Sequence, residues 1–595
     1  MTATTPSRAA SSRRRFDWFG VACAAVIWGV FVGEWALDVE SFAAFLVMVG
    51  TYLIMTLVLL GWWFTRKQFT LGQRFLVPVA AALLGVIAIA LTASAIKPPI
   101  YVVLFGLPIV MTAWAIWVLR ESRRERRPRV GGLIACFVVI GAAFPLMRVN
   151  GTHGNMRADL HWRWTPTAEE MYLAQRPQSA GPTTVPTERQ IELQPGDWPG
   201  FRGPRRDGVV RGLTISTDWA QSPPAVLWRQ RVGPAWSSMA VVDGCVFTQE
   251  QRGPREAVVC RDANTGRETW AHEDAARFDE AMSGPGPRAT PTFANGRIYA
   301  QGALGTLSCL DAATGRLIWS RDVRADSGAA VPMWAFSNSP LVTGDRVIVF
   351  AGGEGKKSLL AYPLDGGAPL WTADAGKVSY ASPQQVESGP QQAVAMFTTE
   401  GFFGIDGKTG HVLWQYPIEP GVGVPAVVQA CQTNASTFVL GAGAAFGLQR
   451  VHVSGDGKSA ARDWITRKMK PSFSDMVYHD GFIYGFDGTV FCCMDATTGE
   501  RRWRDGRYGA GQVLLLADQG VMIVTSEEGE AILLRCNPQK NEELGRVPAI
   551  TGKTWNHPAI AGDRLYVRSD AEMGCLQLKA IDRRPITVGG IEASR

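Results

Sequence analysis

The sequence predicts an all-β eight-bladed β-propeller with four-stranded antiparallel blades, preceded by an all-α bundle of five transmembrane helices. The propeller is indicated by the pattern Asp-x-x-Thr-Gly-x-x-x-Trp, which begins at Asp262, Asp311, Asp406 and Asp495. With looser copies included, successive tryptophans from Trp228 to Trp503 lie 39 to 52 residues apart. A period of about 40 to 50 residues is that of propeller blades. The helical bundle is indicated by long apolar runs in the first quarter of the chain.

Each repeat contains the signature of four short strands. Residues 289–322 show it most clearly, with alternating apolar runs, an Asn-Gly turn, a Gly-rich loop, and the Asp turn before the Trp strand. Eight units begin near Trp236, Ala289, Asn338, Ser382, Pro425, Ser474, Gln512 and Asn556. The last unit has three strands, whereas Trp228 lies in a lone strand before the first unit. We expect that strand to complete the last blade, because an open sheet edge would invite aggregation.

Five apolar runs are each near the length that crosses a bilayer, at residues 19–37, 42–64, 75–96, 100–119 and 131–147. Thirteen Lys or Arg residues flank the runs on the side of the N-terminus, and one, Lys97, lies on the other side. This asymmetry predicts a cytoplasmic N-terminus, with everything after the fifth run outside the cytoplasm. We expect a multi-pass protein of the bacterial inner membrane with its propeller in the periplasm.

We expect three parts: a transmembrane domain at 1–148, a periplasmic linker with a short helix at 149–197, and the propeller at 198–595. Residues 1–148 carry a net charge of +9 and the remainder about −2. A nearly neutral propeller lacks the basic surface of a nucleic-acid binder, so we expect no nucleic-acid partner. In the linker, Trp162 and Trp164 either rest at the lipid headgroups or pack on the underside of the propeller.

Ten cysteines are present, and three of them, Cys260, Cys309 and Cys493, occupy the same place in their repeats. Small apolar side chains pack there, so we expect these thiols to be buried. Cys492 and Cys493 are adjacent in a predicted strand, where successive side chains point to opposite faces. A disulfide between them would distort the strand, which favours free thiols.

The repeats and the segment DWPGFRGPRRDGVV at 197–210 resemble proteins with pyrroloquinoline-quinone-type propeller repeats, over about residues 197–585. The resemblance implies eight blades, with each tryptophan docked between neighbouring blades. The family includes quinoprotein dehydrogenases, which bind pyrroloquinoline quinone and Ca2+, and non-enzymatic propellers such as the lipoprotein of the outer-membrane β-barrel assembly machine. Five spans followed by an external propeller are also similar in layout to membrane-bound quinoprotein glucose dehydrogenase, which passes electrons to ubiquinone.

A candidate ligand site lies at the mouth, the propeller face formed by the loops before each first strand and the loops between second and third strands. The candidate residues there are Trp236, Glu250, Arg288, Trp334, Ser337, Tyr380, Trp555 and His557. Aromatic rings and charges can hold a flat or anionic ligand; equally, the rings can simply fill the tunnel. A long charged loop at 273–291 suggests a lid or a partner contact.

The sequence favours a binding or scaffold module over an enzyme. The seven histidines stand singly without metal-ligand spacing, and no catalytic residue stands out, so we expect neither metal nor cofactor. The expected partners are the lipid bilayer and an envelope protein or small ligand. The alternative is a dehydrogenase of sugars or alcohols that uses pyrroloquinoline quinone with Ca2+ and reduces membrane quinone. On that alternative, Glu250 is the candidate base or metal ligand.

Overall fold

A computed structural model describes residues 18–37, 42–92, 100–121, 130–155, 157–176, 189–388, 391–419 and 426–583. The chain divides into two compact units. One unit, the helical unit, comprises Met1–Thr152 and Ala158–Thr165, and the other, the propeller unit, comprises His153–Arg157 and Pro166–Arg595.

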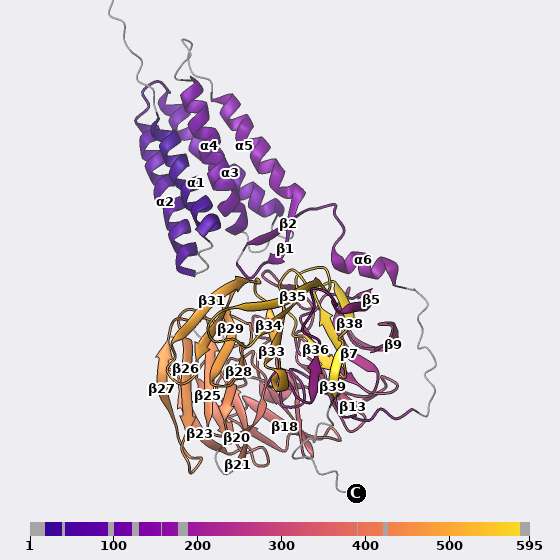
Figure 1. The fold of residues 1–595 in the computed structure, drawn as a ribbon. Coiled ribbons are helices and arrows are strands. Elements are labelled where there is room, and N and C mark those ends of the chain that lie inside the picture. The colour runs from indigo at the N-terminus through magenta and orange to yellow at the C-terminus, as the bar shows by residue number, and fades with distance from the viewer. Residues whose placement is uncertain are drawn as a thin grey trace, which may run out of the picture. The chain divides into compact units, whose positions relative to one another are not determined.

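The helical unit contains five long helices within its described residues (Figure 1). They are α1 (Phe19–Leu37), α2 (Phe42–Phe64), α3 (Leu71–Thr92), α4 (Ile100–Glu121) and α5 (Gly131–Ala143). A 3-10 turn at Phe144–Leu146 connects α5 to a hairpin of β1 (Met147–Thr152) and β2 (Ala158–Trp162). Trp63, Trp114 and Phe137 are buried where the helices pack together.

Three helical segments of the described chain are long and apolar enough to cross a membrane: Leu46–Phe64, Leu71–Thr92 and Val102–Glu121. The apolar segments Phe19–Gly33 and Gly131–Leu146 are shorter. Five helices are therefore present where five are expected, but five membrane spans stay a prediction. The basic residues at 13–15 and 123–129, on which the expected orientation largely depends, lie outside the described residues.

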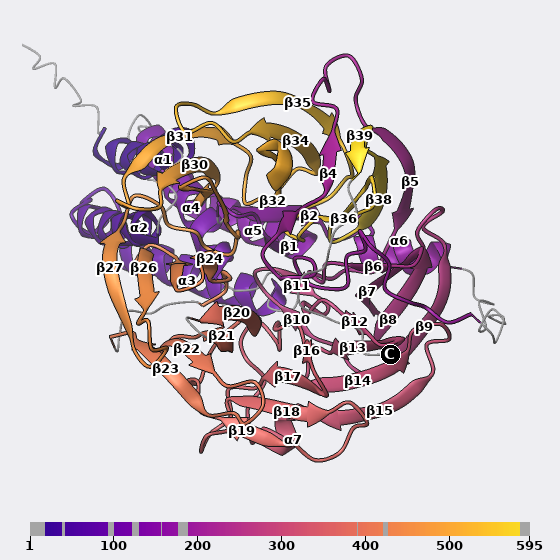
Figure 2. The ribbon, with the colours of Figure 1, turned by 60° about the horizontal axis from the view of Figure 1, so that its bottom comes forward.

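The propeller unit consists of eight antiparallel blades arranged in a ring, as predicted (Figure 2). The first four blades are β6 (Ala240–Val242), β7 (Cys245–Arg252), β8 (Arg255–Asp262), β9 (Glu268–Asp274); β12 (Thr292–Ala294), β13 (Arg297–Gln301), β14 (Thr306–Asp311), β15 (Leu317–Asp322); β16 (Leu341–Thr343), β17 (Arg346–Phe350), β18 (Leu359–Pro363), β19 (Trp371–Ala373); and β20 (Gln384–Ser388), β21 (Gln391–Phe397), β22 (Gly401–Ile405), β23 (Val412–Pro417).

The other four blades follow in chain order, and the predicted unit start at Pro425 lies outside the described residues. They are β24 (Cys431–Asn434), β25 (Thr437–Ala442), β26 (Gly447–Val453), β27 (Ala460–Thr466); β28 (Val477–His479), β29 (Phe482–Asp487), β30 (Val490–Asp495), β31 (Arg501–Arg507); β32 (Gln512–Leu516), β33 (Val521–Thr525), β34 (Glu530–Arg535), β35 (Glu542–Pro548); and β36 (Ala559–Ala561), β37 (Arg564–Arg568), β38 (Glu572–Gln577) with β5 (Ala225–Arg231).

The last blade is closed by a strand from before the first blade, as the sequence predicts. In β5, Trp228 pairs with Cys575 of β38, so the beginning and the end of the propeller share one sheet. A second, smaller pairing joins β4 (Leu213–Ile215) to β39 (Ala580–Arg583). The eighth blade therefore has its full four strands, and β38 is not left as an exposed edge strand.

The repeated Asp-x-x-Thr-Gly turn receives the tryptophan of the preceding blade. In the first turn, Asp262 Oδ1 accepts hydrogen bonds from the amide and the hydroxyl of Thr265, both at 2.9 Å. Gly266 has a φ of 69°, and a Cβ there would lie 2.5 Å from the Trp228 ring, so only glycine fits. Equivalent indole bonds to the next blade, 2.8 to 3.2 Å long, are made by Trp228, Trp270, Trp319, Trp371 and Trp503. The predicted docking between blades is confirmed at these positions.

A ring of hydrogen bonds links the blades around the axis. One residue of each blade contributes to this polar girdle; it stands two positions before the first strand, except in blade 7, where it is the first residue of β32. These residues are Ser238, Thr290, Ser339, Ser382, Gln429, Asp475, Gln512 and His557. From blade 1 to blade 6, the backbone amide at this position donates to the equivalent side chain of the next blade, at 2.6 to 3.0 Å. The Ser238 hydroxyl completes the ring by donating to the His557 carbonyl.

The segment 198–210, here called the axial segment, follows the inner strands of the ring. Trp198 bridges to Val241 of blade 1, and β3 (Val209–Val210) pairs in parallel with β32 of blade 7. Between them, the buried Arg206 guanidinium donates to the carbonyls of Ser339 and Pro383, on blades 3 and 4. Arg202 forms a buried ion pair with Asp475 at 2.9 Å, on blade 6. Two arginines of one short loop thus connect blades that are distant in sequence.

All ten cysteines are free thiols, so the structure contains no bond between Cys492 and Cys493. Cys260, Cys309 and Cys493 are buried, as the sequence predicts. Cys492 and Cys493 both lie in β30, and neither is accessible to solvent.

Replacing Arg206 by methionine should lower the melting temperature of the full chain by several degrees. The change leaves carbonyls of two blades buried without a donor, at about 1 to 3 kcal/mol each. Differential scanning fluorimetry of the detergent-solubilised protein measures the effect. Arg205→Met is the matched control, because Arg205 is exposed in the same loop. Equal melting temperatures for the two variants would show that the axial segment does not hold the ring together.

Candidate functional site

Two aromatic groups lie among the predicted mouth residues. In the first, the Trp555 ring lies 4.7 Å from both the Trp236 ring and the Phe473 ring, measured between centroids. The Lys553 ammonium sits over Trp236 at 5.3 Å and over Trp555 at 4.6 Å. Cation–π attraction of this kind orders both rings and the cation. Sequence reasoning missed Lys553, although its place two residues before a mouth tryptophan was a usable signal.

The second group contains Trp334, Tyr380 and Arg288. The Trp334 and Tyr380 rings lie 4.9 Å apart. Arg288 pairs with Glu280 at 3.1 Å and lies over the Phe278 ring at 4.7 Å. Glu280 and Phe278 belong to the long loop at 273–291, which includes the small hairpin of β10 (Asp279–Glu280) and β11 (Gly284–Pro285). The loop also accepts a hydrogen bond from the Trp236 indole at the carbonyl of Ser283, so this loop and the aromatic residues form one surface.

The Ser337 hydroxyl and the Nε2 atom of His557 are both bonded within the protein. The Ser337 hydroxyl donates to the Trp334 carbonyl at 2.5 Å. His557 Nε2 lies 2.8 Å from the buried Asp475 carboxylate, which also binds Arg202. Burial lowers the pKa of His557, although the neighbouring Asp475 acts in the opposite direction. His557 thus belongs to the polar girdle and holds blade 8 to blade 6.

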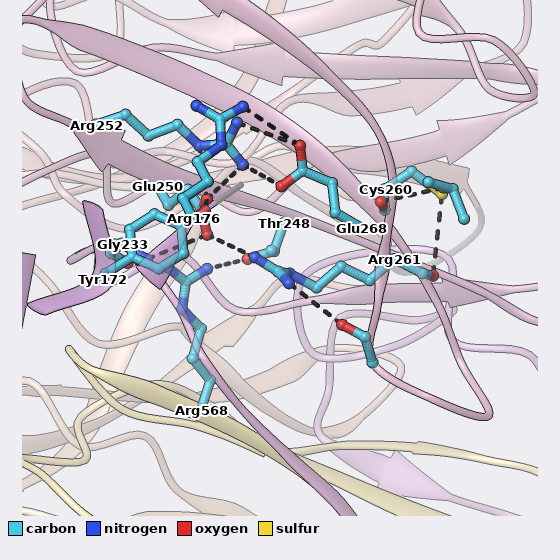
Figure 3. Close-up of polar contacts among 12 residues, drawn as sticks. Tyr172, Arg176, Gly233, Thr248, Glu250, Arg252, Cys260, Arg261, Glu268 and Arg568 are labelled. Atoms are coloured by element: carbon cyan, nitrogen blue, oxygen red, sulfur yellow. Dashed lines mark hydrogen bonds and ion pairs between the residues drawn. The ribbon is translucent and has the colours of Figure 1, made fainter. Parts of the chain in front are cut away.

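Glu250 lies inside strand β7 and not in a loop of the mouth, so its predicted position is wrong. Its carboxylate is fully buried and is bound by Arg252 and Arg261, which approach it to 2.6 and 3.2 Å (Figure 3). Burial alone would raise the pKa of Glu250, but the charges of Arg252, Arg261 and Arg568 and the Tyr172 hydrogen bond lower it to about 2. A carboxylate with such a low pKa and no open face is poorly suited to act as a base.

The short helix α6 (Ala168–Gln175) covers this buried ion cluster. The Tyr172 hydroxyl donates to Glu250 at 2.6 Å, and the Tyr172 side chain is buried. One turn earlier, Glu169 pairs with Arg277 at 2.9 Å, and just after the helix Arg176 pairs with Glu273 at 3.0 Å. The helix begins with a capping box of Thr167 and Glu170. The predicted linker helix is confirmed, but it is docked on blade 1 by three side chains.

Glu256 is a second buried carboxyl near the mouth, and sequence reasoning missed it. It lies in β8, and both of its oxygens accept from the Ala303 amide of blade 2 at 3.1 Å. Burial raises the pKa of Glu256 to about 8, although the amide hydrogen bond acts in the opposite direction. In the sequence it stands directly before the continuous apolar run 257–260, and that position is the available signal.

The acidic side chains of the mouth do not fit a Ca2+ ion held together with pyrroloquinoline quinone. Ca2+ takes about six to eight oxygen ligands. Glu280 already binds Arg288 and the amides of Met282 and Ser283, and Glu527 binds the Trp555 indole. Across the described part of the chain, no group of three or more His, Cys, Asp or Glu side chains is placed to hold a metal ion.

The fold and the docked tryptophans define the class of this protein as an eight-bladed, repeat-built β-propeller. The family model described as outer membrane protein assembly factor BamB matches residues 217–329 and 254–505. The propeller is therefore of the pyrroloquinoline-quinone-like repeat type, as the sequence predicts.

A curated relative and two solved structures are similar to parts of the chain. Quinohemoprotein alcohol dehydrogenase ADH-IIG of Pseudomonas putida is 30% identical over 137 residues, which are 22% of this chain and 18% of the relative. The chain thus matches less than a fifth of that relative's length. BamB from Moraxella catarrhalis matches with a TM-score of 0.44 at 14% identity, covering 60% of this chain and 99% of that one. The structure of ADHIIG from Pseudomonas putida HK5 matches with a TM-score of 0.47 at 14% identity, covering 68% and 82%.

Replacing Tyr172 by phenylalanine should loosen α6 from the propeller, because Glu250 loses a charge-assisted hydrogen bond worth about 1.5 to 3 kcal/mol. Hydrogen–deuterium exchange of the peptide that covers α6 should become at least tenfold faster. Gln175→Ala is the control, since Gln175 is exposed on the same helix. Unchanged exchange in Tyr172→Phe would mean that the buried hydroxyl does not hold the helix.

Replacing Glu256 by glutamine should flatten the dependence of stability on pH between about 5 and 8. The folded-state pKa of about 8 lies above the ordinary 4.5. The neutral carboxyl therefore stabilises the fold below pH 4.5, and that stabilisation is lost as the pH rises to 8, by about 1.4 kcal/mol per unit. Melting temperatures of wild type and variant across this range measure the effect. The exposed Glu387→Gln should keep the wild-type slope; the same slope in Glu256→Gln would exclude Glu256 as its source.

Proposed function

We propose that this protein is a binding or scaffold module of the bacterial cell envelope, with its helices in the inner membrane and its propeller in the periplasm. The mouth binds an envelope protein or a small ligand through its aromatic residues. Three helices with the length and apolar character of membrane spans support the anchoring part of the proposal. A propeller of the pyrroloquinoline-quinone-like repeat type supports the binding part.

The observation that carries the proposal is the chemistry of the mouth. Aromatic rings from five blades lie there in two groups. Lys553 packs on the first group, and Arg288 packs on Phe278 of the neighbouring long loop. Large rings with few rotatable bonds are the residues that dominate protein interfaces. Met333 beside Trp334 is 74% exposed, which extends the apolar surface outward. The acidic groups of the same surface are held by protein donors, which favours recognition over chemistry.

The second candidate is a quinoprotein dehydrogenase, and one observation favours it. The similarity to a quinohemoprotein alcohol dehydrogenase covers 22% of the chain. Against it stand the engaged carboxylates of the mouth and the buried position of Glu250. Binding of pyrroloquinoline quinone is therefore the outcome that would replace the scaffold proposal.

Site-specific photo-crosslinking tests the scaffold proposal in cells that produce the full chain. A photoreactive amino acid at Met333 should form adducts with an envelope component. Trp334→Ala in the same chain should reduce their yield roughly tenfold, because an aromatic anchor is removed. The matched control places the photoreactive residue at Lys408, which is exposed in an Asp-x-x-Thr-Gly turn on the opposite face.

Two outcomes would contradict the proposal. Identical adducts from positions 333 and 408, or a yield unaffected by Trp334→Ala, would show that the mouth does not select a partner. Reduction of an electron-accepting dye by purified protein supplied with pyrroloquinoline quinone, Ca2+ and sugars or alcohols would support the dehydrogenase instead.

A further inference from the structure

The hairpin of β1 and β2 presents one apolar face and one polar face. Met147, Val149 and Ala158 share a face and pack against the core of the helical unit. Leu160 and Trp162 lie on that same face, directly opposite Val149 and Met147. On the other face, Arg148 lies opposite His161. The hairpin is thus amphipathic, with its apolar side on the side of the helices.

Part of this apolar face is uncovered. Leu160 is 42% exposed, Trp162 52% and Trp164 66%, and we call these three residues the apolar stripe. The two indole rings stack on each other, with centroids 5.1 Å apart and planes within 5°. Stacking and the packed neighbours hold the stripe rigidly in an exposed position. Rigid, exposed tryptophans of this kind mark an interaction surface.

The chain path favours lipid as the occupant of this surface. The 3-10 turn Phe144–Leu146 leads from α5 into β1 without a break, so the hairpin lies directly at the end of an apolar helix. The interfacial layer of a bilayer is roughly 5 to 7 Å thick on each side of its hydrocarbon core, which is about the thickness of one such hairpin. Indoles are favoured in this layer because they combine an apolar ring with an N–H donor.

The charges of the hairpin agree with this placement. Arg163 lies between the two tryptophans and is exposed. Its Nη1 atom donates to the Pro145 carbonyl at 3.5 Å, and the remaining N–H groups of the exposed guanidinium can bind lipid phosphates. From these contacts we propose that the β1–β2 hairpin lies in the lipid headgroup layer, with the apolar stripe inserted and the face of Arg148 and His161 toward water. This proposal rests on the membrane anchoring proposed above.

Fluorescence quenching of the full chain in lipid nanodiscs tests the placement. Two lipids are compared, one brominated near the headgroup end of its acyl chain and one brominated near the methyl end. The double variant Trp162→Phe with Trp164→Phe should lose part of the quenching by the shallow lipid and keep the quenching by the deep lipid. Trp236→Phe, at the propeller mouth, is the matched control and should leave both unchanged. The single variant Trp164→Phe is included because Trp164 lies outside the strand, so its replacement should leave the fold of the hairpin intact. It should also lose part of the shallow quenching.

Shallow quenching that is the same in wild type and both stripe variants would overturn the placement, whether the stripe then faces water or another protein. Quenching by neither lipid would overturn the membrane anchoring itself. Retained deep quenching with unchanged shallow quenching would overturn the hairpin proposal alone, so the two failures are distinguishable.

Discussion

The propeller depends on how the backbone groups at its centre are satisfied. Eight inner strands converge on the axis, and the buried residues that enter them carry amides with no partner in a strand, except at Gln512 of β32. The polar girdle resolves this, because each of the six amides from blade 1 to blade 6 donates to a side chain of the next blade. These six bonds run in one direction around the ring, and the Ser238 hydroxyl links blade 1 back to blade 8, so each of these blades fixes the position of its neighbour.

The axial segment and the helix α6 stabilise this ring through further buried hydrogen bonds and ion pairs. Arg206 reaches carbonyls of blades 3 and 4, whereas Arg202 reaches Asp475 of the girdle. Removing one partner of such a buried ion pair leaves an uncompensated charge, which is more costly than the net contribution of the pair. On blade 1, the Tyr172 hydroxyl of α6 donates a further hydrogen bond to the Glu250 carboxylate. Residues that precede the repeats in the sequence therefore help to stabilise the folded propeller.

The mouth differs from the girdle because part of its apolar surface remains exposed to solvent, where a partner can bind. Its charges are engaged internally, as Arg288 is with Glu280, but its rings are arranged in groups with an exposed margin at Met333. Such a surface recognises shape and apolar area more than charge. Paired charges and grouped aromatic rings support the proposed scaffold function. The residues that would select a partner then lie in the mouth loops, where the blades differ from one another in sequence.

The sequence by itself determined the eight blades, the closing strand around Trp228 and the tryptophan docking, because each depends on local turn chemistry and a regular period. It also singled out Trp236, Tyr380 and Trp555 as candidate mouth residues, since each stands four residues before the first strand of its blade. Only the tertiary structure decided that Glu250 is buried among arginines, that His557 belongs to the girdle, and that Arg202 and Arg206 connect distant blades. The physical reason is that a strand pattern gives the face of a side chain but not its partner. Arg252 and Arg261 are close to Glu250 in sequence, but the other partners come from distant blades, from the axial segment and from the preceding helix α6.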